Sequence, residues 1–344
     1  MLHIIPAASS GGISRTRLGG GGAESARQSC GKEFKEQSQE PSIFDPDGVF
    51  ANNRTLTGAR DVKTVASPVP EAFYRVARPR PVNLFVPSGY DRLTPIPLVI
   101  LLHGYYVNNY VEDYMKLRPL AESRGFLYCY PDGTIDAWGN RFWNATDAGC
   151  DFGNTGVDDA GYLRALIEEI AGSFTVDRKR VYLVGYSNGG RMAYRMACQF
   201  ADLVAGIASL AGMPFLDPDR CVPSGPVNIL HIHGTADSID PYGGGALTTQ
   251  NPLFPANMPA SPGAVKAVQI WAGYNDASDP VTDAAPSLNL TDVAGLDTVV
   301  TRYTSYLPGG AVELWTINGG GHVPEPSAEF SPRVIDWLLA HPKP

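Results

Sequence analysis

The stretch VYLVGYSNGG (residues 181–190) decides the fold of this 344-residue chain. It opens with apolar residues typical of a buried strand, and RMAYRMACQF, from residue 191 on, repeats apolar side chains at helical spacing. Between them, Gly185-Tyr186-Ser187-Asn188-Gly189 fits the pattern G-x-S-x-G. A sharp strand-to-helix turn exposes the serine, and the helix N-terminus directs free N–H groups at a developing oxyanion. The stretch therefore predicts a nucleophilic Ser187; the alternative is an ordinary glycine-rich turn.

Segments on both sides of this stretch alternate between strand and helix patterns. IPLVILLHG (residues 96–104) is a continuous apolar run, which is typical of a parallel strand buried on both faces. Strands are expected at residues 74–76, 82–86, 96–104, 126–133, 181–185, 204–212, 227–234, 298–306 and 311–317. Helices are expected at residues 111–124, 158–173, 188–200, 265–274 and 333–339. This order predicts the α/β class: an α/β-hydrolase fold with a mostly parallel central sheet, helices on both faces and a small lid insertion.

The domain organisation follows from where these patterns begin. Residues 1–60 hold glycine-rich patches and a polar run, so we expect a flexible tail there. The catalytic domain is expected over residues 61–344. Within it, residues 240–300 are expected to hold the lid-like insertion, because residues 240–262 are rich in Gly and Pro.

The bulk composition narrows the classes of function. Hydrophobic residues make up 44% of the chain and charged residues 18%, which is ordinary for a globular enzyme. The formal net charge of −8 argues against a nucleic acid or an anionic membrane as partner. No apolar run reaches the roughly 18 residues that a membrane span needs. The N-terminus lacks the pattern of a signal peptide, because its arginines follow the short apolar stretch.

The five cysteines match no zinc pattern, since no CxxC or HxxxH spacing occurs, and no metal or other cofactor is predicted. Cys129 lies in an apolar strand pattern and is expected to be a buried thiol. Cys198 and Cys221 flank one strand segment and are a candidate disulfide pair. An odd number of cysteines leaves at least one of them free.

A nucleophilic serine needs a base, and elimination among the six histidines leads to His322. Two histidines lie in terminal segments, and His103 ends a strand where this fold places its oxyanion loop. The two histidines of strand 227–234 precede the acid candidates, against the Ser, Asp, His chain order of this fold. His322 follows the last strand in the glycine-rich loop NGGGHVPEP. We expect His103 to be a structural hydrogen-bonding residue of its loop.

The acid and the oxyanion donors are expected in loops that follow strands. HIHGTADSIDPY offers Asp237, which comes first after the strand and is favoured, and Asp240, whose alternative role is a turn or lid carboxylate. The predicted oxyanion donors are the backbone N–H groups of Asn188 and Tyr105, with Tyr106 as the alternative to Tyr105.

Aromatic residues gather in the loops where a parallel sheet places its site. Tyr106, Trp143 and Tyr242 are the candidate substrate-binding residues, suited to an aromatic acyl group or a polyester chain. Packing inside the loops is the alternative, above all for Trp143.

Seven segments occur in an order that resembles the poly(3-hydroxybutyrate) depolymerase-type esterases, which are related to the feruloyl and acetylxylan esterases of carbohydrate esterase family one. They span about residues 80–344 and read LVILLHGY, YPDG with RFWNATDAGCDF, GVDDAGYLRALIEEI, DRKRVYLVGYSNGGRMAYRMAC, IASLAGMPF, HIHGTAD and ELWTINGGGHVP. The resemblance implies metal-free ester hydrolysis by a triad of Ser187, Asp237 and His322, with Tyr105 and Asn188 as oxyanion donors.

The chain departs from these esterases at Tyr186, where a histidine is frequent, and it lacks their late pair of cysteines. Members of the group are commonly exported, so an extracellular or periplasmic location is expected. The sequence leaves the oligomeric state open.

Three functions compete at this stage. The first is a serine esterase acting on hydroxyalkanoate-type polyesters and oligoesters or on feruloyl-type esters. The second is a hydrolase of amides or polyamide-like chains with the same triad. The third is a binding protein on a hydrolase scaffold, against which the complete set of Ser187, Asp237 and His322 argues.

Overall fold

The computed structural model describes residues 82–107, 111–147, 149–245, 259–292 and 294–344, together with residue 80 and the backbone of residues 53–56 and 72–76. The chain divides into two compact units, Met1–Phe50 and Ala51–Pro344, and all described residues lie in the second unit. In the described part, no helix has the length and apolar character that crossing a membrane requires.

The second unit is built on an 11-stranded sheet. Its order across the sheet is β1 (Asn53–Leu56), β2 (Ala72–Val76), β3 (Val82–Val86), β5 (Leu127–Cys129), β4 (Ile96–Leu102), β8 (Val176–Tyr186), β9 (Gly206–Leu210), β10 (Asn228–Gly234), β13 (Val312–Ile317), β12 (Thr298–Ser305) and β11 (Ser278–Thr282). A separate two-stranded hairpin joins β6 (Thr134–Ile135) to β7 (Arg141–Phe142).

The middle of the sheet is parallel and its margins are mixed. From β5 through β4, β8, β9 and β10 to β13, every neighbouring pair is parallel. β3 joins β2 and β5 antiparallel, β12 joins β13 and β11 antiparallel, and β1 pairs with β2 in parallel. Every residue of β9 and β10 is buried, as expected for strands covered on both faces.

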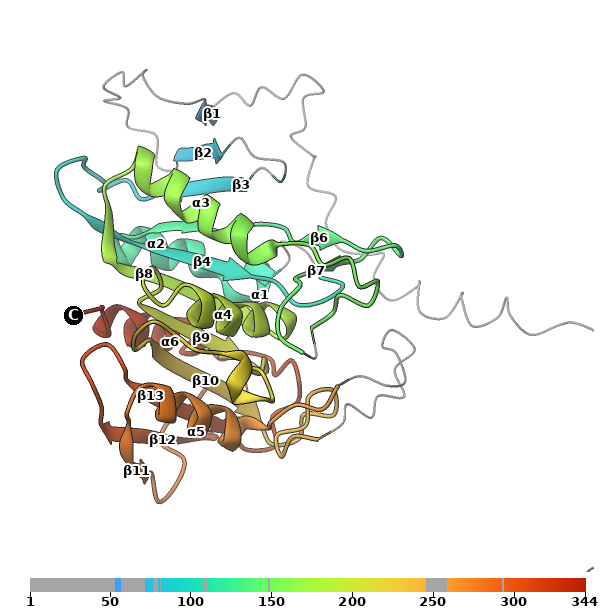
Figure 1. Ribbon diagram of the computed structural model, residues 1–344. Coiled ribbons are helices and arrows are strands. Elements are labelled where there is room, and N and C mark those ends of the chain that lie inside the picture. Colours follow the sequence, from blue (N-terminus) through green and yellow to red (C-terminus); the bar gives the residue numbers. More distant parts are fainter. Residues whose placement is uncertain are drawn as a thin grey trace, which may run out of the picture. The chain divides into compact units, whose positions relative to one another are not determined.

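Helices cover both faces of the sheet (Figure 1). On one face, α3 (Asp159–Ser173), α4 (Asn188–Gln199) and α5 (Ala264–Tyr274) share one hydrophobic core with the strands. On the other face, α1 (Val111–Met115), α2 (Leu117–Arg124) and α6 (Phe330–Ala340) contribute to a second core. The α/β-hydrolase fold predicted from the sequence is confirmed.

The single helix predicted over residues 111–124 is wrong, because the structure has two helices there. Lys116 adopts a left-handed backbone conformation with φ 49° and ends the first turn. The Glu112 carboxylate then accepts the N–H groups of Leu117 and Arg118, at 3.2 and 2.9 Å, and so caps the start of α2. This capping contact favours the break over a continuous helix.

The predicted tail and the predicted lid-like insertion both contain regular secondary structure. β1 lies inside the segment 1–60 that was expected as a tail, and its backbone pairs with β2. The segment 240–300 contains α5, whose apolar side packs on the sheet, and β11, which pairs with β12. Residues 246–258 lie outside the described residues.

The cysteines follow the sequence predictions. Cys198, at the end of α4, forms a disulfide with Cys221, which follows the 3-10 turn Pro218–Arg220. Cys129 is a buried free thiol, as is Cys150, whereas Cys30 lies outside the described residues.

We expect the double substitution Cys198→Ala and Cys221→Ala to lower the free energy of unfolding by about 3 kcal/mol, because it reopens a loop with a sequence separation of 23. Urea unfolding with and without reductant measures this. Reductant should destabilise the wild type by a similar amount and leave the variant unchanged. Equal stability of oxidised wild type and variant would contradict the prediction.

Candidate active site

The turn between β8 and α4 presents Ser187 in a backbone conformation that few residues adopt. Ser187 has φ 52° and ψ −116°, which lies in the left-handed half of the map. Its N–H donates to the Leu210 carbonyl at 2.8 Å, and its carbonyl accepts the N–H of Arg191 at 3.0 Å. These two bonds fix the serine backbone between strand β9 and the first turn of α4.

The glycines beside the serine are required by close backbone contacts. A Cβ at Gly185 would lie 2.2 Å from the Gly189 carbonyl oxygen, and a Cβ at Gly189 would lie 2.1 Å from the carbonyl oxygen of Leu102. Both contacts are with backbone atoms, so a side chain would force β8, β4 and α4 apart. The pattern G-x-S-x-G therefore has a steric cause here.

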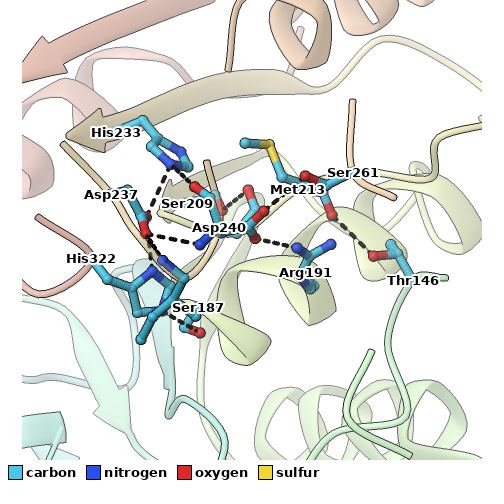
Figure 2. Close-up of polar contacts among 12 residues, drawn as sticks. Thr146, Ser187, Arg191, Ser209, Met213, His233, Asp237, Asp240, Ser261 and His322 are labelled. Carbon is cyan, nitrogen blue, oxygen red and sulfur yellow. Dashed lines mark hydrogen bonds and ion pairs between the residues drawn. The ribbon is translucent and has the colours of Figure 1, made fainter. Parts of the chain in front are cut away.

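Loops after three parallel strands bring Ser187, Asp237 and His322 together (Figure 2). The carboxyl ends of β8, β10 and β13 meet at one edge of the sheet. His322 Nε2 lies 2.9 Å from Ser187 Oγ, and His322 Nδ1 lies 2.8 Å from Asp237 Oδ2. With its Nδ1–H donated to the carboxylate, the neutral ring keeps Nε2 free to accept the serine proton.

The Asp237 carboxylate is buried and has four polar partners, three of which donate hydrogen bonds to it. Oδ1 accepts the N–H groups of Ile239 and Asp240 at 2.9 and 2.8 Å. Oδ2 faces His322 Nδ1 and also His233 Nε2, the latter at 3.1 Å. Burial raises the pKa of Asp237, but the hydrogen bonds from His233 and His322 outweigh it and hold that pKa well below its usual range.

The second acid candidate, Asp240, has different partners. Its carboxylate forms a buried ion pair with Arg191 of α4 and accepts Ser261 Oγ at 2.8 Å. The structure brings Asp237, and not Asp240, to the imidazole of His322. Arg191 was missed by the sequence analysis; a charged residue on the apolar side of an amphipathic helix was the available signal.

The loop after β4 places Tyr105 and Tyr106 differently. The N–H of Tyr106 donates to the Arg141 carbonyl at 3.0 Å and so already has a backbone acceptor. The Tyr105 side chain is buried, and its hydroxyl donates to Asp136 Oδ2 at 2.8 Å. Burial, and then this hydrogen bond, raises the pKa of Tyr105. The anchored side chain holds the Tyr105 peptide in place.

His103 orients the peptide group that precedes Tyr105. Its Nε2 accepts the N–H of Gly133 at 2.8 Å, so in the neutral ring Nδ1 carries the proton and donates to the Gly104 carbonyl at 2.7 Å. In a trans peptide, the N–H of Tyr105 points opposite to that carbonyl. The expected structural role of His103 agrees with this geometry.

Asn188 and Trp143 hold each other through the backbone of Trp143. The N–H of Trp143 donates to Asn188 Oδ1 at 2.7 Å, and Asn188 Nδ2 donates to the Trp143 carbonyl at 3.0 Å. The Trp143 indole N–H donates to the His103 carbonyl at 3.1 Å. Because Trp143 is fully buried, it has no surface to offer a substrate, which corrects its prediction as a substrate-binding residue.

The other two predicted substrate-binding residues lie in different surroundings. Tyr106 is 64% exposed in the loop that carries Tyr105. Tyr242 is half-buried; its hydroxyl lies 2.8 Å from Thr316 Oγ1 and its ring packs edge-on against His233, 5.8 Å between centroids. Tyr106 is thus open to a ligand, whereas Tyr242 packs against His233.

The chain is similar to known esterases. The family model described as "Esterase PHB depolymerase" matches residues 81–235, which include Ser187. NocK of Nocardia uniformis subsp. tsuyamanensis, assigned as an esterase, is 29% identical over 247 residues, or 70% of this chain and 69% of that protein. Feruloyl esterase B of Piromyces equi is also 29% identical over 247 residues, or 71% of this chain but only 42% of that protein.

A solved structure supports the fold alone. The acetyl xylan esterase from Aspergillus awamori superposes with a TM-score of 0.54 at 15% identity, over 78% of this chain and 99% of that one. The resemblance to depolymerase-type and feruloyl esterases is confirmed, and with it the class of carboxylic ester hydrolase.

The buried His103 predicts a pH-dependent stability. Burial lowers its pKa to about 4, whereas an exposed histidine has a pKa of about 6.5. Between these values the unfolded chain binds a proton that the folded protein does not. Neutral His103 therefore contributes fully to the free energy of unfolding above pH 6.5. This contribution, about 3 kcal/mol in total, is lost as the pH falls towards 4.

Urea unfolding between pH 7.5 and 4.5 tests this with the variant His103→Asn, which cannot titrate. The free energy of unfolding should fall less steeply with decreasing pH in His103→Asn than in the wild type. Parallel pH curves for wild type and His103→Asn would refute the assignment.

Proposed function

We propose that this relative of the depolymerase-type and feruloyl esterases hydrolyses carboxylic esters through a covalent acyl-enzyme on Ser187. His322 is the general base and acid, and Asp237 orients the imidazole and stabilises its cation. The backbone N–H groups of Tyr105 and Asn188 stabilise the oxyanion. No step in this scheme calls on a metal or another cofactor.

One observation carries the proposal: the unbroken contact from Ser187 Oγ to His322 Nε2 at 2.9 Å and from His322 Nδ1 to Asp237 at 2.8 Å. Both distances lie in the range that direct proton transfer and firm orientation of the base require. The nucleophile also stands at the N-terminus of α4, where N–H groups have no acceptor inside the helix.

The reaction starts with attack of Ser187 Oγ on the ester carbonyl carbon while His322 Nε2 takes the serine proton. The resulting oxyanion receives the N–H groups of Tyr105 and Asn188, each of which lowers the barrier by about 3 kcal/mol. Collapse of the tetrahedral intermediate expels the alcohol, which takes the serine proton from His322. Water, deprotonated by the same imidazole, then attacks the acyl carbonyl carbon, and His322 returns the proton to Ser187 Oγ as the acid is released.

Two supports hold the proposed oxyanion donors. The His103 ring holds the Gly104 carbonyl, and this fixes the opposite direction of the Tyr105 N–H. Asn188 is the first residue of α4, and its side chain is clamped by both backbone groups of Trp143. These contacts support the proposal, because oxyanion stabilisation requires donors that are fixed before substrate arrives.

The proposed substrates are hydroxyalkanoate-type polyesters and oligoesters or feruloyl-type esters. The names of the matching family and of the Piromyces equi relative support these two classes. Tyr106 and Trp138, which are 64% and 66% exposed, offer aromatic surface to such acyl groups. None of the relatives named above is called an amidase, so amides serve here as comparison substrates.

We also propose an extracellular or periplasmic location. The Cys198–Cys221 disulfide supports it, because such bonds persist in oxidising compartments.

Ser187→Ala tests the proposed chemistry. We expect it to lower kcat/KM for p-nitrophenyl butyrate at least about 10⁴-fold, because no other group replaces the nucleophile. Assays with methyl ferulate, a polyhydroxybutyrate film and the p-nitroanilide of butyric acid then define the substrate class. The control Ser123→Ala, on exposed α2, should keep wild-type rates. Retention of a tenth of the activity in Ser187→Ala would rule out the proposed nucleophile.

A further inference from the structure

Two buried histidines of β10 continue the line of contacts beyond Asp237. Side chains alternate along a strand, so His231 and His233 point to the same face as Ile229, which is the face covered by α4. Both histidines are completely buried, and their rings stack with centroids 5.4 Å apart. Strand interiors at this depth normally hold aliphatic residues, so two imidazoles need a reason.

The two rings form a chain of polar contacts that ends on the Asp237 carboxylate. Tyr194 of α4 places its hydroxyl 2.9 Å from His231 Nδ1. His231 Nε2 lies 3.2 Å from His233 Nδ1, and His233 Nε2 lies 3.1 Å from Asp237 Oδ2. Figure 2 shows the last link, with His233 and His322 approaching Asp237 from opposite sides.

The acceptors at the Asp237 end set the direction of every proton in this chain. His233 Nε2 faces two acceptors, Asp237 Oδ2 and the Asp240 carbonyl at 2.8 Å, so it must carry a proton. In a neutral ring His233 Nδ1 is then an acceptor and takes the proton from His231 Nε2. His231 Nδ1 in turn accepts the hydroxyl of Tyr194. All three groups thus donate towards the carboxylate.

We propose that His233 is a positioning residue for ester hydrolysis, that it holds the Asp237 carboxylate against His322, and that His231 and Tyr194 fix the proton of His233 on Nε2. This inference rests on the proposed function, in which Asp237 is the acid of the triad. His233 touches no reacting atom and acts only through Asp237.

The lone pairs of Asp237 show what His233 supplies. Oδ1 is occupied by two backbone N–H groups of its own loop, which hold one edge of the carboxylate. Oδ2 has one remaining acceptor site besides that used by His322, and His233 Nε2 is the group beside it, 3.1 Å from this oxygen. Without His233, a buried anionic oxygen would keep a single donor, and the carboxylate could rotate away from His322.

The contacts from Tyr194 through His231 and His233 also connect the Asp237 loop to α4, the helix that follows Ser187. Tyr194 and Arg191 both belong to α4, which begins directly after Ser187. Tyr194 reaches the loop through the two histidines, and Arg191 reaches it through the Asp240 carboxylate. The Asp240 carbonyl accepts His233 Nε2, so the two connections meet at His233.

The charged and titratable groups around His233 come from three directions. On its own strand and the loop after it are His231, Asp237 and Asp240. From α4 come Arg191, through Asp240, and Tyr194, through His231. The ring of Tyr242 packs edge-on against it, and His322 lies across the carboxylate.

Kinetics of His233→Leu and His233→Gln test the positioning role. Leu removes the donor, and we expect kcat for p-nitrophenyl butyrate to fall about 10–100-fold while KM stays within twofold. The side-chain amide of Gln reaches the position of Nε2 and should recover most of that loss. Tyr194→Phe should lower kcat about twofold to fivefold. The control variants His341→Leu and Tyr274→Phe alter groups that do not contact Tyr194, His231, His233 or Asp237. They should leave kcat unchanged.

A pH profile separates positioning from simple loss of packing. In His233→Leu, Asp237 becomes a stronger acceptor towards His322, so the coupled pair binds its proton at higher pH. The acid limb of kcat/KM should therefore move to higher pH in His233→Leu and return towards the wild-type position in His233→Gln. Equal loss of kcat in both variants with an unmoved acid limb would overturn the proposal.

Nitrogen-15 NMR of the histidine-labelled wild type gives a readout that needs no variant to fold and no substrate. Near pH 8, His231 and His233 should both carry their single proton on Nε2. A proton on Nδ1 of His233 would overturn the proposal. A wild type that cleaves no ester would refute the proposed function instead, while the NMR result would still report on the chain of donors.

Discussion

The left-handed backbone of Ser187 is the constraint on which the site depends. A φ of 52° costs a non-glycine residue free energy, and the surrounding contacts must hold it. They do so through the hydrogen bond to Leu210, the packing of Gly185 on Gly189, and the start of α4 one residue later. In the proposed mechanism, the turn that presents the hydroxyl also directs the first N–H groups of α4 at the oxyanion.

The partners of this serine come from loops that the parallel sheet places together. β13 lies next to β10, and the Ala236 N–H donates to the Gly320 carbonyl at 2.9 Å, which joins the acid loop to the histidine loop. Next to Asp237, a group of buried polar side chains contact one another: His231, His233, Tyr194, Arg191 and Asp240. Such a network stabilises one arrangement strongly, because each unmatched group would be costly at this depth. Rigidity of the acid loop follows from it.

Much of this could be predicted from the sequence, since the strand–turn–helix pattern and the order of Ser187, Asp237 and His322 depend on local residue types. The remainder depends on contacts between distant segments. The helix break at Lys116 follows from a carboxylate four residues earlier that accepts N–H groups of the next turn. Trp143 is buried because its loop folds back onto Asn188, and aromatic character alone does not distinguish burial from exposure. His233 was set aside as a base by chain order, which left its contact with Asp237 unseen.

The most direct test of the account is to label the nucleophile covalently. Wild-type protein is treated with a fluorophosphonate, which reacts preferentially with a serine activated by a base, and the modified peptide is located by mass spectrometry. The account predicts one stoichiometric adduct on Ser187 that is abolished by prior unfolding and absent from His322→Ala. An adduct on another residue, or folded protein that stays unmodified, would contradict it.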